Sequence, residues 1–207
     1  MNILIDDLPK EIDGVPIETD YRKMIQFEQL MFDEEISIQQ KYVYALNLLY
    51  LKPVPDFIKA WRGLLWFFRC GNENKEASSS TTQGKLVYDF EQDAEYIYSA
   101  FWQVYRIDLQ KEPLHWWAFM SLLSALPDSC LMGQIMQYRS MDTSKLKGLE
   151  KKRVQEIQRK FAIRHQEGIH KMTLEERNGA FLAKVKQRQK EANEWLKKQA
   201  KEGFNGR

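Results

Sequence analysis

One segment of the sequence sets the first constraint on the fold. Residues 56–68 read DFIKAWRGLLWFF and carry apolar side chains nearly all round a helix. A helix without a polar face lies in the centre of a core or beside a partner. The Pro53-Val54-Pro55 sequence separates it from the preceding segment, because proline lacks an amide donor and clashes with the previous helical turn. The sequence therefore predicts a body of several helices packed around this one.

Apolar residues recur with a helical period along most of the first 140 positions. The expected helices cover about 19–32, 38–51, 56–68, 90–105, 113–126 and 128–139. Before them, Ile3-Leu4-Ile5 is typical of a strand. Asp13-Gly14 between apolar residues predicts a type I′ hairpin, because both central positions of that turn need positive φ. The predicted fold class is mainly α, a helical bundle body with a short N-terminal β-hairpin and a long charged C-terminal helical extension.

Charge divides the chain into two parts. Positions 1–138 hold 12 of the 31 basic and 20 of the 29 acidic residues, a net charge of −8, which leaves 19 and 9, or +10, for 139–207. We therefore expect a body over 1–141 and a basic, charged helical extension over 142–207. Interspersed acidic residues and few aromatic ones favour a solvated helical arm over a nucleic-acid site, which stays the weaker alternative.

Other local patterns complete this organisation. Asp142 is placed to cap the first helix of the extension, and the capping box at Thr173-Leu174-Glu175-Glu176 predicts a second helix after a break at Gly168. Residues 71–85, GNENKEASSSTTQGK, carry no apolar side chain larger than Ala77. They are expected to form a flexible loop, either within one domain or as a linker between two.

Composition argues against secreted and membrane classes. Two cysteines, Cys70 and Cys130, are too few for a disulfide scaffold or a Cys-rich zinc site. The N-terminus lacks the charge and apolar run of a signal peptide, and the longest apolar stretch is far below the roughly 20 residues that a membrane span needs. We expect a soluble cytoplasmic protein that takes no membrane partner.

No catalytic or cofactor pattern is recognisable. His165 and His170 are five residues apart, which on a helix places their rings about 140° apart and prevents them from sharing a metal. His115 lies in an aromatic run that favours a structural role. Cys130, before a predicted helix, is interpreted either as an activated thiol or as a small core residue. The glycines form no phosphate-binding string. We expect no enzyme activity, cofactor or metal.

A succession of motifs adds a resemblance. Residues 88–142 contain in order YDFEQDAEYIYSAF, YRIDL, HWWAF and IMQYRSMD, and the N-terminal part supplies the hairpin, TDYRKMIQFEQL and a helix that ends in FFRCG. In combination these motifs resemble the bacteriophage gene-product-fifteen family, encoded near the tape-measure gene of long-tailed phages and prophages of Gram-positive bacteria. The resemblance covers most of residues 1–150.

The resemblance implies a role in tail morphogenesis. It suggests a tail-assembly chaperone in the host cytoplasm that binds the helical tape-measure protein and keeps it soluble. The major tail-tube protein is a second implied partner, and a homo-oligomer and presence in the mature virion are left open. The alternatives are a minor structural tail component and a nucleic-acid-binding regulator that uses the basic extension. The family transfers no catalytic residue.

The candidate residues are of two kinds. Four tryptophans either line grooves that shield a partner's apolar stripe or pack in the core: Trp61, Trp66, Trp102 and Trp116. The motif residues are candidates for specifying the fold: Asp93, Phe101, Tyr105, Asp108, His115, Trp116, Trp117, Phe119, Arg139 and Asp142. Among them, Arg139 is expected to form a buried structural pair with Asp93 or Asp108.

Overall fold

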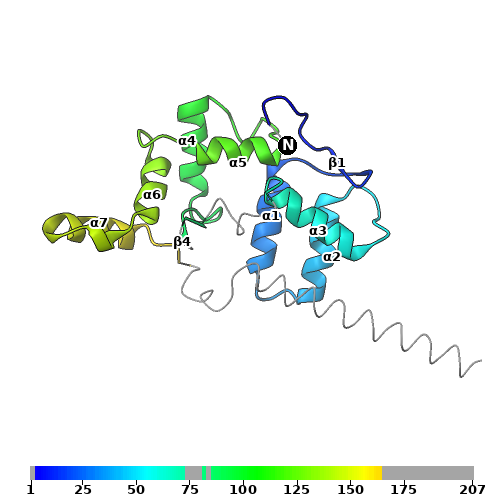
Figure 1. Cartoon of the computed structure of the whole chain (residues 1–207), viewed down its shortest axis with the longest axis horizontal. Helices are drawn as coiled ribbons and strands as arrows, with labels where there is room; N and C mark the ends of the chain where they lie inside the picture. Colours follow the sequence, from blue (N-terminus) through cyan, green and yellow to red (C-terminus); the bar gives the residue numbers. More distant parts are fainter. Residues whose placement is uncertain (1–2, 73–80, 83–84, 165–207) are drawn as a thin grey trace, which may run out of the picture. The chain divides into compact units, whose positions relative to one another are not determined.

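The computed structural model describes residues 3–72, 81–82 and 85–164 (Figure 1). The described elements are β1 (Glu11–Ile12), β2 (Val15–Pro16), α1 (Tyr21–Phe32), α2 (Ile38–Leu49), α3 (Phe57–Phe68), β3 (Thr81–Thr82), β4 (Lys85–Leu86), α4 (Ala94–Tyr105), α5 (Trp116–Ser124), α6 (Leu131–Ser140), the 3-10 helix η1 (Thr143–Lys145) and α7 (Gly148–Lys160). The predicted mainly α class is confirmed. The chain divides into two units, Met1–Arg164 and His165–Arg207. The second unit, with the helix predicted from Thr173, lies outside the described residues.

The all-round apolar helix, α3, lies in the core as predicted. Its Trp61 side chain is fully buried and meets the rings of Phe27 from α1 and Tyr42 from α2, with centroids 6.1 and 4.5 Å away. A Cβ at Gly63 would lie 2.5 Å from the Tyr50 hydroxyl oxygen. Glycine at this position therefore allows Tyr50 to approach the helix closely, and the Tyr50 hydroxyl donates to the Ala60 carbonyl at 3.0 Å. Burial on several sides explains why α3 has no polar face.

Helix α5 connects α1 and α3 to α4 (Figure 1). Phe119 of α5 stacks on Tyr21 of α1, with 4.4 Å between ring centroids, and on Phe101 of α4, with 5.0 Å. The indole N–H groups of Trp116 and Trp117 donate to the carbonyls of Phe68 and Phe67, each at 2.8 Å. Carbonyls in the last turn of a helix lack intrahelical donors. The two tryptophans therefore complete the end of α3 while they bury their rings.

The predicted N-terminal hairpin is confirmed, and the predicted strand before it is wrong. Asp13 and Gly14 have φ angles of 51° and 76°, and Ile12 pairs with Val15 across the turn. Ile3-Leu4-Ile5 forms turns instead, and its side chains are exposed. The sheet that contains β1 has β2 as its other strand. The Ile3-Leu4-Ile5 segment therefore lies outside this two-stranded sheet.

Four predicted helix starts differ from the structure because side chains cap the backbone elsewhere. The helix expected from residue 128 begins at Leu131, where the Cys130 sulfur caps it. The helix expected from Phe90 begins at Ala94. Pro113 does not open α5, because His115 caps that helix by accepting from the Trp117 amide at 3.1 Å. Asp142 caps η1 by accepting from the Ser144 amide at 2.9 Å, and α7 begins only at Gly148. A proline or an aspartate thus indicates that a helix begins nearby, but it does not indicate at which residue the helix begins.

The segment expected as one flexible loop contains a second hairpin. Strands β3 and β4 pair antiparallel, with Thr81 opposite Leu86 and Thr82 opposite Lys85. Within the expected loop, residues 73–80 and 83–84 lie outside the described residues. Strand β4 contacts α6, which places this part of the polar segment against the helical body. Polar composition alone did not indicate this pairing.

Truncation of Trp116 tests whether its ring is core. Trp116 is 1% exposed, whereas Trp102 on α4 is 49% exposed. We predict that Trp116→Ala lowers the free energy of unfolding by about 3–5 kcal/mol, because it leaves a large cavity. Trp102→Ala, a matched control, should cost below about 1 kcal/mol. Urea unfolding followed by circular dichroism measures both, and an unchanged midpoint for Trp116→Ala would contradict the assignment.

Candidate functional site

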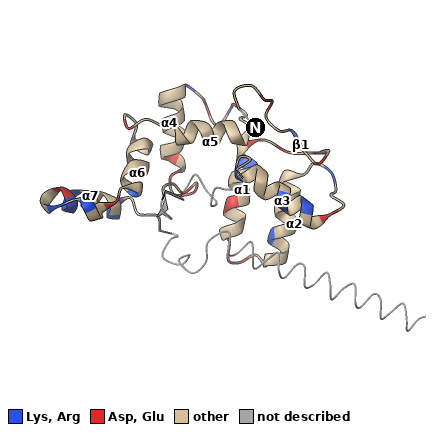
Figure 2. Cartoon of the chain, viewed as in Figure 1, with Lys and Arg blue, Asp and Glu red and all other residues tan. Residues whose placement is uncertain are grey.

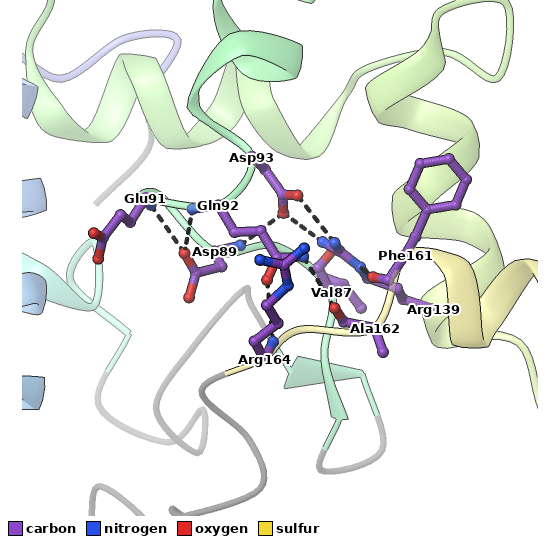
Figure 3. A network of polar contacts seen from close by, with 9 residues as sticks. All are labelled: Val87, Asp89, Glu91, Gln92, Asp93, Arg139, Phe161, Ala162 and Arg164. Carbon is purple, nitrogen blue, oxygen red and sulfur yellow. Dashed lines mark hydrogen bonds and ion pairs between the residues drawn. The ribbon is translucent and has the colours of Figure 1, made fainter.

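A buried ion pair joins Arg139 of α6 and Asp93, the residue before α4 (Figure 3). Both side chains are buried, and Arg139 donates through Nη2 to Asp93 Oδ1 at 2.9 Å and through Nη1 to Oδ2. Arg139 also donates from Nη1 to the Val87 carbonyl at 3.1 Å and from Nε to the Phe161 carbonyl at 2.7 Å. The two terminal nitrogens of the guanidinium group thus bind both oxygens of the carboxylate, and each group neutralises the charge of the other.

A tight turn prepares the Asp93 carboxylate for this pair. The Asp89 amide donates to Asp93 Oδ2 at 2.9 Å, and the Asp93 amide donates back to the Asp89 carbonyl at 2.9 Å. Asp89 Oδ1 accepts from the amides of Glu91 and Gln92 at 2.9 and 2.7 Å (Figure 3). Aspartate side chains compete with helical hydrogen bonding in this way. The competition explains why α4 begins at Ala94 and not at Phe90.

The same network fastens the segment that follows α7. The Gln92 side chain donates from Nε2 to the Ala162 carbonyl at 3.0 Å and accepts from the Arg164 amide at Oε1, also at 3.0 Å. Earlier in the chain, Gln158 of α7 donates from Nε2 to the carbonyls of Tyr138 and Met141 at 2.8 and 2.9 Å. The chain is therefore held to the body up to Arg164.

Asp108, the other partner expected for Arg139, serves a different cluster. It accepts from the Tyr98 hydroxyl at 3.2 Å and from the Gln110 amide at 3.0 Å, and it pairs with Lys111 Nζ at 3.1 Å. The hydrogen bond from Lys111 is the main cause that lowers the pKa of Asp108. Of the two partners that the sequence left open for Arg139, the structure selects Asp93.

His115 has a structural environment. Its Nδ1 accepts from the Trp117 amide, so the proton resides on Nε2, which donates to the Pro9 carbonyl at 3.0 Å. Burial is the main influence on this imidazole and lowers the pKa of His115, against the opposing effect of the Pro9 hydrogen bond. The ring therefore ties the N-terminal segment to the start of α5, and both of its nitrogens are engaged.

The cysteines occupy packed positions. Cys130 is buried and caps α6, where its sulfur accepts from the Gly133 amide at 3.4 Å and donates to the Pro127 carbonyl at 3.2 Å. Burial raises the pKa of Cys70 to about 12, which suppresses its thiolate. Of the two interpretations of Cys130, the small core residue fits this packing. Within residues 3–72, 81–82 and 85–164, no group of three His, Cys, Asp or Glu side chains could hold a metal ion.

The aromatic candidates separate into core and surface. Trp61, Trp116 and Trp117 are buried together with the motif residues Phe101 and Phe119, and the Tyr105 hydroxyl donates to the Leu122 carbonyl at 2.8 Å. Trp66 is half-buried, edge-on to Trp117 at 5.2 Å between ring centroids. Trp102 is the expected groove residue that presents its ring at the surface, and exposed Tyr98 lies one turn before it on α4. The four tryptophans therefore do not line one groove.

Glu28 is a site residue that the sequence analysis did not single out. It lies on the half-buried side of α1, and burial, followed by the nearby Asp89 carboxylate, raises the pKa of Glu28 to about 8. Its position one turn after Met24 on the apolar stripe of α1 was the available signal. The raised pKa favours the protonated, uncharged form of Glu28 beside the Asp89 carboxylate.

Helix α7 shows that the basic character of the extension begins within the first unit. It carries Lys151, Lys152, Arg153, Arg159 and Lys160 against Glu150 and Glu156, while Val154 is buried (Figure 2). Apart from this buried face, α7 presents mixed charge to solvent. None of the described helices is long and apolar enough to cross a membrane.

Breaking the buried ion pair should strongly destabilise the body. We predict that Arg139→Met lowers the free energy of unfolding by about 3–5 kcal/mol, because it leaves the Asp93 carboxylate buried without its counter-charge. Arg139→Met combined with Asp93→Leu should recover part of the loss. Lys111→Met is the matched control, since Lys111 is 82% exposed in its pair with Asp108 and should cost below about 1 kcal/mol. Equal urea midpoints for both single variants would contradict the prediction.

The raised pKa of Glu28 predicts a pH-dependent stability difference. Because the folded-state value of about 8 exceeds the ordinary value of 4.5, the protonated form is favoured on folding. The contribution is fully present below about pH 4.5 and is lost as the pH rises to about 8. Glu28→Gln, which imitates the protonated acid, should melt at the same temperature as the wild type at pH 4 and at a higher one at pH 9. A lower melting temperature at pH 9 would contradict this.

Comparison with known proteins assigns the family. No curated protein and no solved structure matches the chain. The sequence does match the family described as Bacteriophage Gp15 protein over residues 4–163, a range that contains the buried ion pair, the tryptophans of α5 and helix α7. The chain therefore belongs to the bacteriophage Gp15 protein family.

Proposed function

We propose that this phage-related protein is a tail-assembly chaperone. In this role it binds the helical tape-measure protein of a long-tailed phage in the host cytoplasm, keeps it soluble, and helps tail-tube subunits to assemble around it. It acts as a binding protein and not as an enzyme. Family membership supports the phage context. The observation that carries the binding role is an exposed aromatic face on α4.

Trp102 and Tyr98 form this aromatic face. They are four residues apart on α4 and therefore point to the same side of the helix. Trp102 is 49% exposed, unlike the buried tryptophans of α3 and α5. The hydrogen bond from the Tyr98 hydroxyl to Asp108 holds the tyrosine ring in place. Tryptophan and tyrosine supply much of the binding energy at protein interfaces, because they cover a large area with few rotatable bonds.

The chemistry of the face suits an amphipathic helix. Such a helix presents apolar residues at i, i+3, i+4 and i+7, and these can pack on two aromatic rings one turn apart. The exposed Glu95 lies one turn before Tyr98 and favours lysine or arginine beside the apolar stripe of the partner. A long helical client exposes such apolar stripes to water until the tail tube encloses it. A protein that binds the stripes keeps the client soluble during this time.

The minor structural tail component is the second candidate. It would use the same binding face but would remain in the particle. Mass spectrometry of purified virions separates the two functions, because a chaperone should be absent or strongly substoichiometric relative to the tape-measure protein. A nucleic-acid-binding regulator would instead shift DNA or RNA at low salt and lose affinity steeply as salt rises.

Co-expression with the cognate tape-measure protein tests the proposed role. We predict that the wild-type chain raises the soluble yield of the tape-measure protein and co-purifies with it. Trp102→Ala should weaken the complex by roughly 30-fold, the loss expected for a hot-spot aromatic residue. Its melting temperature should stay close to that of the wild type. Affinity is measured by titration with a tape-measure fragment.

Leu149→Ala provides the control for this experiment. Leu149 is 85% exposed on α7, so it tests whether any exposed apolar side chain contributes to the complex. Equal losses for Leu149→Ala and Trp102→Ala would point to non-specific hydrophobic adhesion. Failure of the wild-type chain to co-purify with the tape-measure protein or raise its soluble yield would overturn the proposed function.

A further inference from the structure

Helix α2 carries an uncharged stripe at the surface, made of apolar and amide side chains. Exposed positions recur at helical spacing through Gln40, Val43, Tyr44 and Asn47 and continue to Leu51 just past the end of the helix. Val43 is 54% exposed, Tyr44 48% and Leu51 62%. Single exposed apolar residues are normal at protein surfaces, but several large ones gathered on one side of a helix with no charge among them indicate a contact surface.

The outer side of α2 has no charged side chain. The sequence IQQKYVYALNLL contains one charged residue, Lys41, and this lysine is buried, with Nζ donating to the Met31 carbonyl at 3.0 Å. A helix that faces only water ordinarily places lysine, arginine or glutamate on its outer face. Helix α7 follows that rule, whereas the single charged residue of α2 is buried.

The two ends of the stripe carry opposite charge. Glu34 and Glu35 are exposed directly before α2, and Lys52 is exposed directly after Leu51. Beyond Lys52, Asp56 and Lys59 offset each other in sign. An antiparallel copy of the same helix would therefore bring its lysine end to the acidic end of the first. Antiparallel packing also sets the positive N-terminus of each helix dipole beside the negative C-terminus of the other.

These features are self-complementary, which selects a second copy of this chain as the occupant. A two-fold contact places the same patch on both subunits, so any charge in the middle of the patch would meet its own sign. The middle of α2 avoids this repulsion because it is neutral, and its ends attract each other when they are antiparallel. The amide side chains of Gln40 and Asn47 both donate and accept, so they can pair across such an interface.

We propose that α2 forms the two-fold interface of a homodimer, packed antiparallel against α2 of a second copy. With the axis between Val43 and Tyr44, Val43 faces Tyr44 of the second copy, Gln40 faces Asn47, and Glu35 lies level with Lys52. The proposal is independent of the tail-assembly role, because it uses α2 and not the aromatic face on α4. A helix of 12 residues is only about 18 Å long. The contact is smaller than a standard interface, so dissociation constants on the order of micromolar are expected.

Sedimentation velocity of the full chain over a micromolar concentration series tests this dimer. The wild type should shift from monomer to dimer as the concentration rises. Val43→Glu should remain monomeric at every concentration, because it places two carboxylates in the interface. Leu51→Lys provides a second, more exposed variant with the same expected loss. Leu149→Glu on α7 is the control and should dimerise like the wild type. Circular dichroism checks that each variant is folded.

Charge exchange tests the antiparallel arrangement. Glu35→Lys alone and Lys52→Glu alone should each weaken the dimer several-fold at low salt, and the double variant should restore it. Three outcomes would overturn the proposal: a monomeric wild type at all concentrations, an undiminished dimer in Val43→Glu, or a double variant that is weaker than both single ones. A monomeric wild type whose Val43→Glu variant loses the tape-measure protein would assign the stripe to that client.

Discussion

The Arg139–Asp93 pair is the interaction that joins segments far apart in the sequence. Two charges are withdrawn from water, which is costly, and the cost is offset only because each atom of the pair has a partner. The carbonyls of Val87 and Phe161 and the amide of Asp89 supply those partners. The pair therefore requires α6, the turn before α4 and the end of α7 to be in place together. All of its hydrogen bonds are made together only in this one arrangement of the segments.

Neutral side chains at the start of α5 form a second connection between segments far apart in the sequence. Tandem tryptophans at the start of α5 donate to the last carbonyls of α3, and His115 beside them engages the N-terminal segment. Each of these side chains combines an apolar ring with one or two polar atoms, so it fills the core and completes the backbone at once. The aromatic run is therefore explained by packing, and exposed Trp102 stands apart from it.

The sequence predicted the elements whose cause is local. Glycine and aspartate tolerate the positive φ that the hairpin turn requires, and the apolar character of α3 requires burial. It did not predict where α4 and α5 begin, because Asp89 and His115 compete with proline and aromatic residues as local signals. The sequence left two candidate partners for Arg139, Asp93 and Asp108, because both aspartates lie in aromatic motifs. The raised pKa of Glu28 depends on neighbours from another part of the chain, which periodicity does not reveal.

The two exposed apolar faces differ in chemistry, and this difference decides which partner suits each. The α4 face consists of aromatic rings beside a carboxylate, a combination that tolerates many apolar stripes with basic flanks and favours a varied client. The α2 face is built from aliphatic and amide side chains and one tyrosine, with opposite charges at its ends, so its best complement is its own reversed copy. Because separate helices carry the two faces, dimerisation through α2 would leave the α4 rings available and would present them twice. A long helical client with repeated stripes would gain from this through the high effective concentration of the second face.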